Sequence, residues 1–133
     1  DIRALQKIEI QMATSYFDIL INSVEVTDNF IINKIISYLY THLENHLSLE
    51  EIANDLNIST GYLSSCFKKN MNTSVMSYFK KIKIERGKTL LLDSNKSILE
   101  ISTLLGFCDQ CHFSKIFKSE TGYTPTQWRN LKL

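Results

Sequence analysis

The chain carries one pattern twice, in SLEEIANDLNISTGYLSSCFKK at residues 48–69 and in SILEISTLLGFCDQCHFSKIFKS at residues 97–119. The copies are offset by 49 residues before their central turn and by 50 after it, because the second copy has one additional turn residue. A repeat of this length indicates a supersecondary unit present twice. Two copies are too few for a solenoid, so the pattern predicts a tandem pair of helix-turn-helix units.

Each copy opens with a helix-start signal. Ser48 is followed three residues later by Glu51, and Ser97 by Glu100, which is the spacing of a capping box. Each first helix then meets a residue that tolerates positive φ, Asn57 in one copy and Gly106 in the other. The helices that follow are predicted at about 60–71 and 110–121. Their expected caps are Ser59 and Asp109 at the start, and Asn72 and Gly122 at the end.

The second helix of each unit has one apolar stripe, which we expect to face a core. The stripes are Leu63, Cys66 and Phe67 in the first unit, and Phe113, Ile116 and Phe117 in the second.

A helix over about 74–94 is predicted to join the two units, with Val75, Tyr78, Phe79, Ile82, Leu90 and Leu91 apolar. About 20 residues at roughly 1.5 Å each span about 30 Å. Successive major-groove faces on one side of B-DNA lie about 34 Å apart. Gly87 within this helix costs roughly 1 kcal/mol relative to Ala, so we expect a close helix–helix approach there.

The remaining sequence also predicts helices. An apolar stripe indicates a helix over 1–26 (Leu5, Ile8, Met12, Tyr16, Leu20, Val24), and another indicates one over about 30–45 (Ile31, Ile35, Ile36, Leu39, Leu43). Thr27-Asp28-Asn29 is expected to break the chain between them. Thr124-Pro125 predicts a short last helix over about 125–132. The fold class is therefore all-α, with about seven helices plus an extra N-terminal one.

Charge is divided unevenly along the chain. Residues 1–56 hold 3 Lys+Arg and 9 Asp+Glu, a net charge of −6, whereas residues 57–133 hold 12 and 5, a net charge of +7. A basic half that contains both second helices favours a polyanionic partner. The sequence has no apolar run long enough for a transmembrane helix, and we expect no membrane partner. Three cysteines, an odd number, fit a reducing cytosol, so a cytoplasmic location is predicted.

The segment Gly106-Phe107, Asp109, His112–Lys115, Phe117-Lys118, Thr121–Pro125 and Trp128-Arg129 resembles the second helix-turn-helix signature of AraC/XylS-family transcription regulators. The resemblance extends over about residues 30–133. It implies a DNA-binding domain with its first helix-turn-helix at about 48–72 and its second at about 97–122. Residues 1–29 would be a linker or the end of an N-terminal effector or dimerisation domain. Double-stranded DNA and RNA polymerase are the implied partners, and a homodimer is possible through the N-terminal segment or a further domain.

Two sets of residues are candidates for DNA contact. The base-reading candidates are Thr60, Gly61, Ser64 and Ser65 on the first recognition helix, and Gln110, Cys111, Ser114 and Lys115 on the second. The family often has Arg at the position of Ser65, so the first surface cannot make a bidentate Arg–guanine contact. Gln suits adenine and Lys suits guanine, so more base discrimination is expected from the second. The phosphate candidates are Ser59, Lys68, Lys69, Lys80, Lys81, Lys83 and Lys118.

Other chemistries have weaker support. Cys108-Asp109-Gln110-Cys111-His112 matches the c-type haem attachment pattern, but it falls on a turn and helix start that the repeat already explains. A zinc site or thiol redox sensing at Cys108 and Cys111 is an alternative. No catalytic constellation is present, so neither an enzyme, a cofactor nor a metal is predicted. The rival hypothesis is a protein-interaction or redox-sensing helical module of the same fold with little sequence-specific DNA reading.

Overall fold

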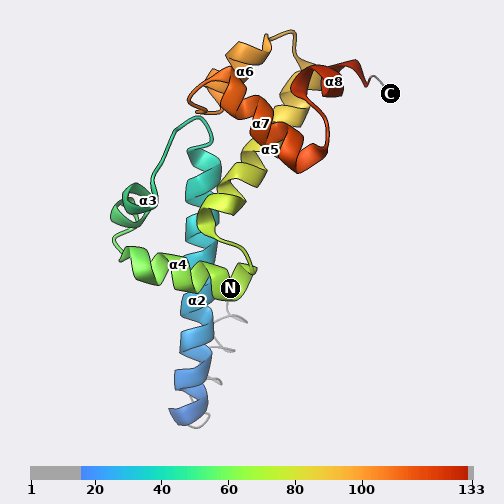
Figure 1. Ribbon diagram of the computed structural model, residues 1–133. Coiled ribbons are helices and arrows are strands. Elements are labelled where there is room, and N and C mark those ends of the chain that lie inside the picture. The colour runs from blue at the N-terminus through green and yellow to red at the C-terminus, as the bar shows by residue number, and fades with distance from the viewer. Residues whose placement is uncertain (1–15, 132–133) are drawn as a thin grey trace, which may run out of the picture. The chain divides into compact units, whose positions relative to one another are not determined.

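The computed structural model describes the backbone of residues 16–131 and the side chains of residues 28–131. Within this part the secondary structure consists of seven helices and no strands, as predicted (Figure 1). The helices are α2 (Tyr16–Thr41), α3 (Leu49–Asp55), α4 (Thr60–Met71), α5 (Val75–Asp93), α6 (Ile98–Leu104), α7 (Gln110–Thr121) and α8 (Pro125–Asn130). None of these helices is long and apolar enough to cross a membrane. The chain divides into two compact units between Ile35 and Ile36, and the second unit contains both helix-turn-helix motifs.

The predicted break at Thr27-Asp28-Asn29 is wrong, because α2 runs through these residues without interruption. Thr, Asp and Asn each cost only about 0.7 kcal/mol or less relative to Ala inside a helix, and neither Gly nor Pro accompanies them. The helix ends at Thr41 and not at Asn45. The predicted stripe over 1–26 lies outside the described side chains. On the following stretch the predicted Ile35 and Leu39 are buried, whereas Ile31 is half-buried and its neighbour Ile32, which was not predicted, is buried.

The predicted helix starts are confirmed at the level of single hydrogen bonds. The hydroxyl oxygens of Ser48 and Ser97 accept from the backbone N–H three residues ahead, at 3.2 Å and 3.0 Å. A complete capping box is found at Thr124, whose hydroxyl accepts from the N–H of Gln127 while its own N–H donates to the Gln127 side chain. At Ser48 and Ser97 the structure shows only the Ser half of the box.

Four residues adopt positive φ among those described, and they are the four that the repeat predicts. Asn57 (φ 58°) and Gly106 (φ 73°) form the central turns. Asn72 and Gly122 end α4 and α7 in the left-handed conformation, and each cap N–H donates to the carbonyl of a lysine four residues earlier. The two helix-turn-helix motifs therefore share their local backbone chemistry and not only their apolar pattern.

The second helix-turn-helix stands on its own core, to which α5 contributes Ile84 and Leu91. The remaining buried members are Ile101, Leu105, Phe113 and Phe117. At Gly87 an added Cβ would lie 3.3 Å from Leu105 Cδ1 and 3.4 Å from Phe113 Cε1. The close approach predicted at this glycine is therefore confirmed. Arg129 ties α8 to this core, since it donates to the carbonyls of Leu91 and Lys96.

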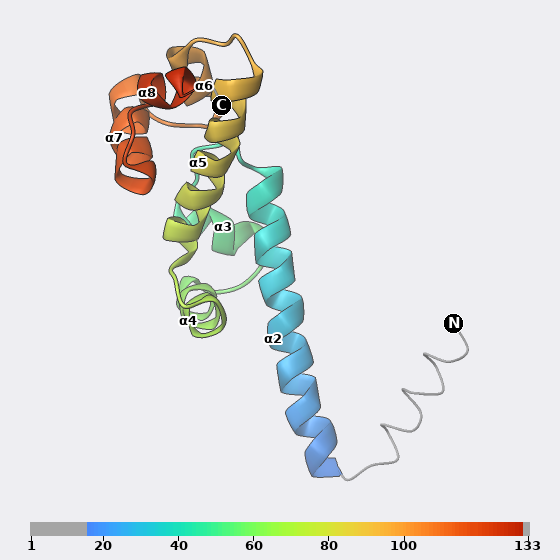
Figure 2. The same ribbon diagram turned by 90° about the vertical axis from the view of Figure 1, so that its right-hand side faces the viewer.

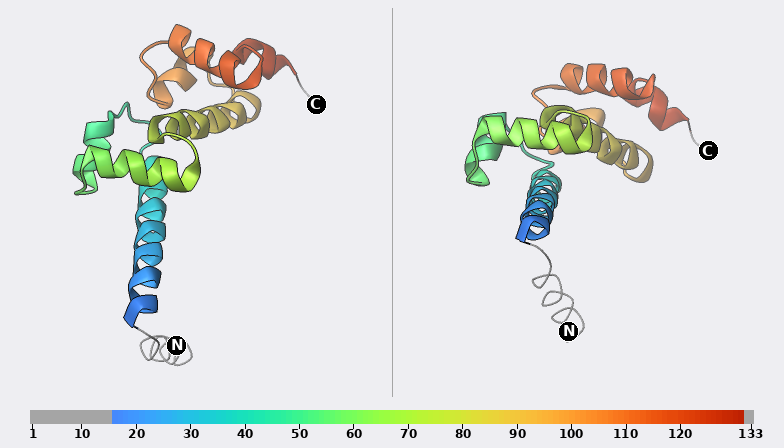
Figure 3. Two further views of the ribbon diagram at one scale, coloured as in Figure 1. Left: turned by 60° about the horizontal axis from the view of Figure 1, so that its bottom comes forward. Right: turned by 90° about the horizontal axis from the view of Figure 1, so that it is seen from below.

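The first helix-turn-helix uses the other end of α5. Its buried side chains include Ile52 of α3, Leu63 and Phe67 of α4, and Val75 and Phe79 of α5. The ring of Phe67 meets Tyr78 edge-on at 5.4 Å. Figures 2 and 3 show α5 passing from the α3–α4 pair to the α6–α8 group. Both helix-turn-helix motifs thus pack on a single helix, α5.

Candidate nucleic-acid interface

The first recognition helix, α4, has one buried and one exposed face. Leu63, Cys66 and Phe67 are buried, as the stripe predicts. The predicted base readers on α4 lie on its outer side: Gly61, Ser64 and Ser65 are exposed and Thr60 is half-buried. The hydroxyl of Ser65 donates to the carbonyl of Gly61 at 2.9 Å. It is therefore left mainly as an acceptor, which suits a base amino group better than a base carbonyl.

The second recognition helix, α7, presents a more varied surface. Asp109 caps it by accepting from the N–H of His112 at 2.7 Å. Gln110, Cys111 and Lys115 are exposed, and Ser114 is half-buried. The side chains of Gln110 and Lys115 form no hydrogen bond or ion pair with any described residue. Both are therefore free to meet a ligand.

Two aromatic rings at matching positions of the repeat were not predicted as site residues. Tyr62, in the first turn of α4, is 40% exposed, and His112 is exposed in the first turn of α7. The two positions are 50 residues apart, which is the offset of the repeat after its turn. The sequence contains the signal for them: both copies have an aromatic residue at the same position of the recognition helix, outside the apolar stripe, where a polar residue is usual.

Five of the seven predicted phosphate contacts are exposed lysines, namely Lys68, Lys69, Lys80, Lys81 and Lys118. The base-reading candidate Lys115 is a sixth exposed amine. None of these six forms an ion pair with a residue that the structure describes, whereas Lys88 pairs with Glu85 at 2.7 Å. Ser59 is also exposed, and its hydroxyl oxygen accepts from the N–H of Tyr62 at 3.1 Å. Lys68, Lys69 and Lys118 lie in the last turns of α4 and α7, where they also favour the helix dipole.

Lys83 does not belong to this group. Its side chain is only 5% exposed, and its Nζ donates to the carbonyl of Asn45 at 2.7 Å. Burial lowers the pKa of this amine from 10.5 to about 8. We therefore withdraw Lys83 from the phosphate candidates: the chain folds over it, and no phosphate could reach it.

The cysteines that match the haem pattern are exposed and unpaired. Cys108 lies in the turn before α7 and Cys111 in the first turn of that helix, while the third cysteine, Cys66, is buried. No group of three or more His, Cys, Asp or Glu residues among those described could hold a metal ion. A redox role for Cys108 and Cys111 stays a prediction.

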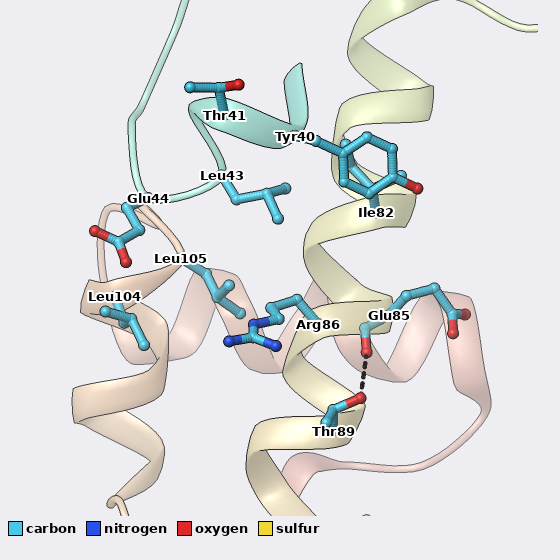
Figure 4. A pocket seen from close by; sticks show the side chains of 10 residues that line it. All are labelled: Tyr40, Thr41, Leu43, Glu44, Ile82, Glu85, Arg86, Thr89, Leu104 and Leu105. Atoms are coloured by element: carbon cyan, nitrogen blue, oxygen red, sulfur yellow. Dashed lines mark hydrogen bonds between the residues drawn. The ribbon is translucent and has the colours of Figure 1, made fainter. Parts of the chain in front are cut away.

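A cavity of about 550 Å³ lies behind the recognition helices and contains none of their candidate residues. It is lined by the end of α2 and the loop after it, by one side of α5 and by the end of α6. Figure 4 shows Arg86 extending from α5 toward Leu105 within it. Glu44 and Glu85 also line the cavity, so its charge is mixed. The cavity thus lies between the end of α2, α5 and the end of α6, and no residue of α3 or α4 lines it.

Two capped helix-turn-helix motifs on one helix, each with an exposed second helix, define a paired helix-turn-helix module. A family model described as a helix-turn-helix domain matches residues 52–131. The chain belongs to this family, in its AraC-type branch, whose members are DNA-binding transcription regulators and not enzymes.

Individual relatives agree with this assignment. The chain is 34% identical over 98 residues to the Msm operon regulatory protein of Streptococcus mutans, an alignment that covers 74% of this chain and 35% of that protein. It thus spans about a third of the length of the curated relatives it matches. The C-terminal domain of AraT, a response regulator from Geobacillus stearothermophilus, superposes with a TM-score of 0.75 at 33% identity, over 77% of this chain and 86% of that one.

A further solved structure shows the same fold at lower identity. The DNA-binding domain of AdpA, a global transcriptional factor crystallised in complex with a target DNA, matches with a TM-score of 0.71 and 17% identity. This match covers 74% of this chain and 89% of that one.

Proposed function

We propose that the protein is a sequence-specific DNA-binding transcription regulator that places α4 and α7 in successive major grooves. The observation that carries the proposal is the repeated architecture: each helix stands on its own core and turns an exposed, largely polar face outward. The helix joining them has 19 residues and is therefore about 28 Å long, comparable to the roughly 34 Å of one duplex turn. The family relationship supports the same partner, double-stranded DNA.

The two helices would contribute differently to recognition. Gln110 and Lys115 offer the side chains that suit adenine and guanine, so α7 would set most of the base choice. The α4 surface of Thr60, Gly61 and Ser64 is small and uncharged, which favours close approach and contacts to a thymine methyl or the backbone. Lys68 and the other exposed lysines would neutralise phosphates without selecting a sequence.

The domain boundaries and further partners belong to the same proposal. Residues 30–133 would form the DNA-binding domain, and residues 1–29 a linker or the end of an effector or dimerisation domain. Phe30, an aromatic side chain 64% exposed on α2, supports an apolar contact near that boundary, including one with a second copy of the chain. RNA polymerase is the expected protein partner, and the cytoplasm is the expected location.

Selection of bound duplexes from a random pool tests the function directly. We expect one enriched asymmetric site whose two conserved blocks lie about 10 base pairs apart. Affinity for that site should fall about 500-fold between 50 and 200 mM salt, since the five exposed lysines among the phosphate candidates would each release a counterion. No enrichment, or binding to duplex that ignores salt, would contradict the proposal and favour the protein-interaction alternative.

Two matched variants separate base reading from phosphate contact. Lys115→Ala should relax the base preference at one position of the selected site, at a cost of about 1–3 kcal/mol on the preferred base. Lys68→Ala should weaken binding to all sequences alike and lower the salt slope by about 1. Identical selection profiles for wild type and Lys115→Ala would remove Lys115 from the base-reading group.

A further inference from the structure

A buried cation lies where the two helix-turn-helix motifs meet. The amine of Lys83, in the middle of α5, donates to the carbonyl of Asn45 and lies 4.3 Å from the ring centre of Phe79 and 5.5 Å from that of Phe107. No carboxylate accompanies it among the described residues. A buried charge without a counterion is costly, and an apolar side chain of similar length would fill the space more cheaply. The lysine therefore suggests a role beyond filling the core.

The turn of the second motif packs closely against the same Asn45 peptide. A Cβ added at Gly106 would lie 2.7 Å from the carbonyl carbon of Asn45 and 2.8 Å from its oxygen. Asn45 belongs to the loop that leads into α3, three residues before the Ser48 cap. The loop entering the first motif is thus held between α5 and the turn of the second.

Little else joins the two motifs directly. In the described part, neither α3 nor α4 packs extensively on α6, α7 or α8, and both motifs pack mainly on α5 or within themselves. Two cavities lie beside the Asn45 contact: Glu44 lines the cavity of about 550 Å³, and His46 and Leu47 line another of about 80 Å³. The Asn45 contact is therefore a small packed region, with a cavity on the residues before it and another on the residues after it, that connects the loop before α3 to α5 and the Gly106 turn.

Helix geometry places Lys83 between the two surfaces that α5 buries. At about 100° per residue, Val75, Phe79 and Ile82 fall within roughly 60° of one another around the helix. Ile84, Gly87 and Leu91 form a second group about 140° from the first. Lys83 falls between the groups, at the edge of both cores. From there the contact continues through Phe107, whose ring lies 5.2 Å from Phe113 of the recognition helix α7.

We propose that Lys83 is a positioning residue for two-site DNA binding, which fixes the spacing and phase of α4 and α7 by holding the Asn45 carbonyl against the Gly106 turn. This inference rests on the proposed function. A rigid pair of readers binds two half-sites as one event only if their geometry is already correct. Without the Asn45 contact, each motif would keep its own core and its own surface, but their mutual placement would depend on α5 alone.

The test compares wild type with Lys83→Met, whose unbranched side chain is one atom shorter and has no donor. Lys96→Met, which removes an exposed charge outside the candidate interface, is the matched control. Binding is measured to the selected site, to the same site with one or two base pairs inserted between its blocks, and to a duplex with only the α7 block. If Lys83→Met unfolds at the assay temperature by circular dichroism, Lys83→Gln, which cannot reach Asn45, replaces it.

We expect wild type and Lys96→Met to lose about 10-fold or more in affinity per inserted base pair, because each insertion rotates and displaces one block. Lys83→Met should bind the original spacing about 10-fold more weakly, lose about 3-fold or less on insertion, and match wild type on the single block. An unchanged spacing profile in Lys83→Met would overturn the inference alone. An equal loss on every duplex would also overturn it, since it would indicate general damage. A flat profile in wild type would overturn the two-groove function itself.

A measurement without DNA separates the inference from the function. Spin labels at Lys69 of α4 and Ser119 of α7, introduced in a Cys108→Ser, Cys111→Ser background, report the distance between the recognition helices by pulsed dipolar spectroscopy. We expect a single narrow distribution in the otherwise wild-type protein and a clearly broadened one with Lys83→Met. Distributions of equal width would overturn the positioning role even if DNA binding is confirmed.

Discussion

The glycines of this chain offer one substitution in three surroundings, and the structure predicts a different result for each. Gly106 has a φ of +73° and its missing Cβ would meet the Asn45 backbone at 2.7 Å. Gly122 has a similar φ of +84°, but a Cβ there would have no neighbour within 4 Å. Gly61 lies in the first turn of α4 with the same open space and an ordinary helical conformation. Replacing each by Ala separates conformational strain from crowding.

The expected magnitudes follow from these surroundings. Gly122→Ala carries only the left-handed penalty, about 1 kcal/mol of unfolding free energy. Gly106→Ala carries the same penalty and also displaces the Asn45 peptide, which loses its hydrogen bond from the Lys83 ammonium. That loss costs a further 1.5–3 kcal/mol, or about 2.5–4 kcal/mol in total. Gly61→Ala should stabilise the protein by about 0.5–1 kcal/mol, because Ala is the better helix former.

Urea denaturation followed by circular dichroism at 222 nm measures these differences. The slope with denaturant must stay constant across the series for the midpoints to report stability. The informative quantity is the difference in unfolding free energy between Gly106→Ala and Gly122→Ala, which we expect to be about 1.5–3 kcal/mol. Equal losses for the two variants would refute the reasoning, because they would show that contact with the Asn45 backbone contributes nothing.

Three further substitutions test other parts of the structure. Phe113→Ala should cost about 3–5 kcal/mol of unfolding free energy, read from the shift in urea midpoint, because the ring is fully buried in the second core. Thr124→Ala should cost about 1 kcal/mol by the same measurement, since it removes the cap of α8. The pKa of Lys83 is lowered from 10.5 to about 8, so between these values the unfolded chain binds more protons and stability rises with pH. Relative to Lys83→Met, the unfolding free energy of wild type should therefore increase by up to about 3 kcal/mol from pH 7.5 to 10.5. The other titratable groups around the same cavity, His46, Lys80 and His112, are present in both proteins and cancel in the comparison. No increase would show that the amine is not desolvated.

Local rules predict the two motifs well because each signal acts within a few residues. The caps at Ser59 and Asp109 and the positive φ at Asn57 and Gly106 depend only on neighbouring backbone groups. The repeat strengthens each of these signals, since the same chemistry recurs at the same offset. The α4 and α7 boundaries at 60–71 and 110–121 match the prediction for this reason.

What the sequence does not reveal depends on contacts between distant residues. From the sequence alone, Lys83 is expected at the surface. In the structure it is buried, and its amine donates to the carbonyl of Asn45, 38 residues earlier in the chain. The end of α2 at Thr41 also differs from the prediction: residues 42–44 form a turn, and the N–H of Asn45 donates to the carbonyl of His42. For the candidate interface, the sequence predicts which residues are exposed on α4 and α7, but their contacts with DNA remain a prediction.

The joining helix shows why a single apolar stripe is the wrong expectation for a helix shared by two cores. The sequence prediction named Val75, Phe79 and Ile82 with Leu91, but it missed Ile84. A helix that packs on one core needs one stripe of apolar residues, whereas α5 needs two stripes, one toward its start and one toward its end, on different sides. Any substitution between these stripes acts on both cores at once. Lys83 occupies this position. We therefore expect its side chain to affect both the spacing of the two recognition helices and the stability of the fold. Only a measurement that separates spacing from stability, such as binding to sites with inserted base pairs, can assign its role.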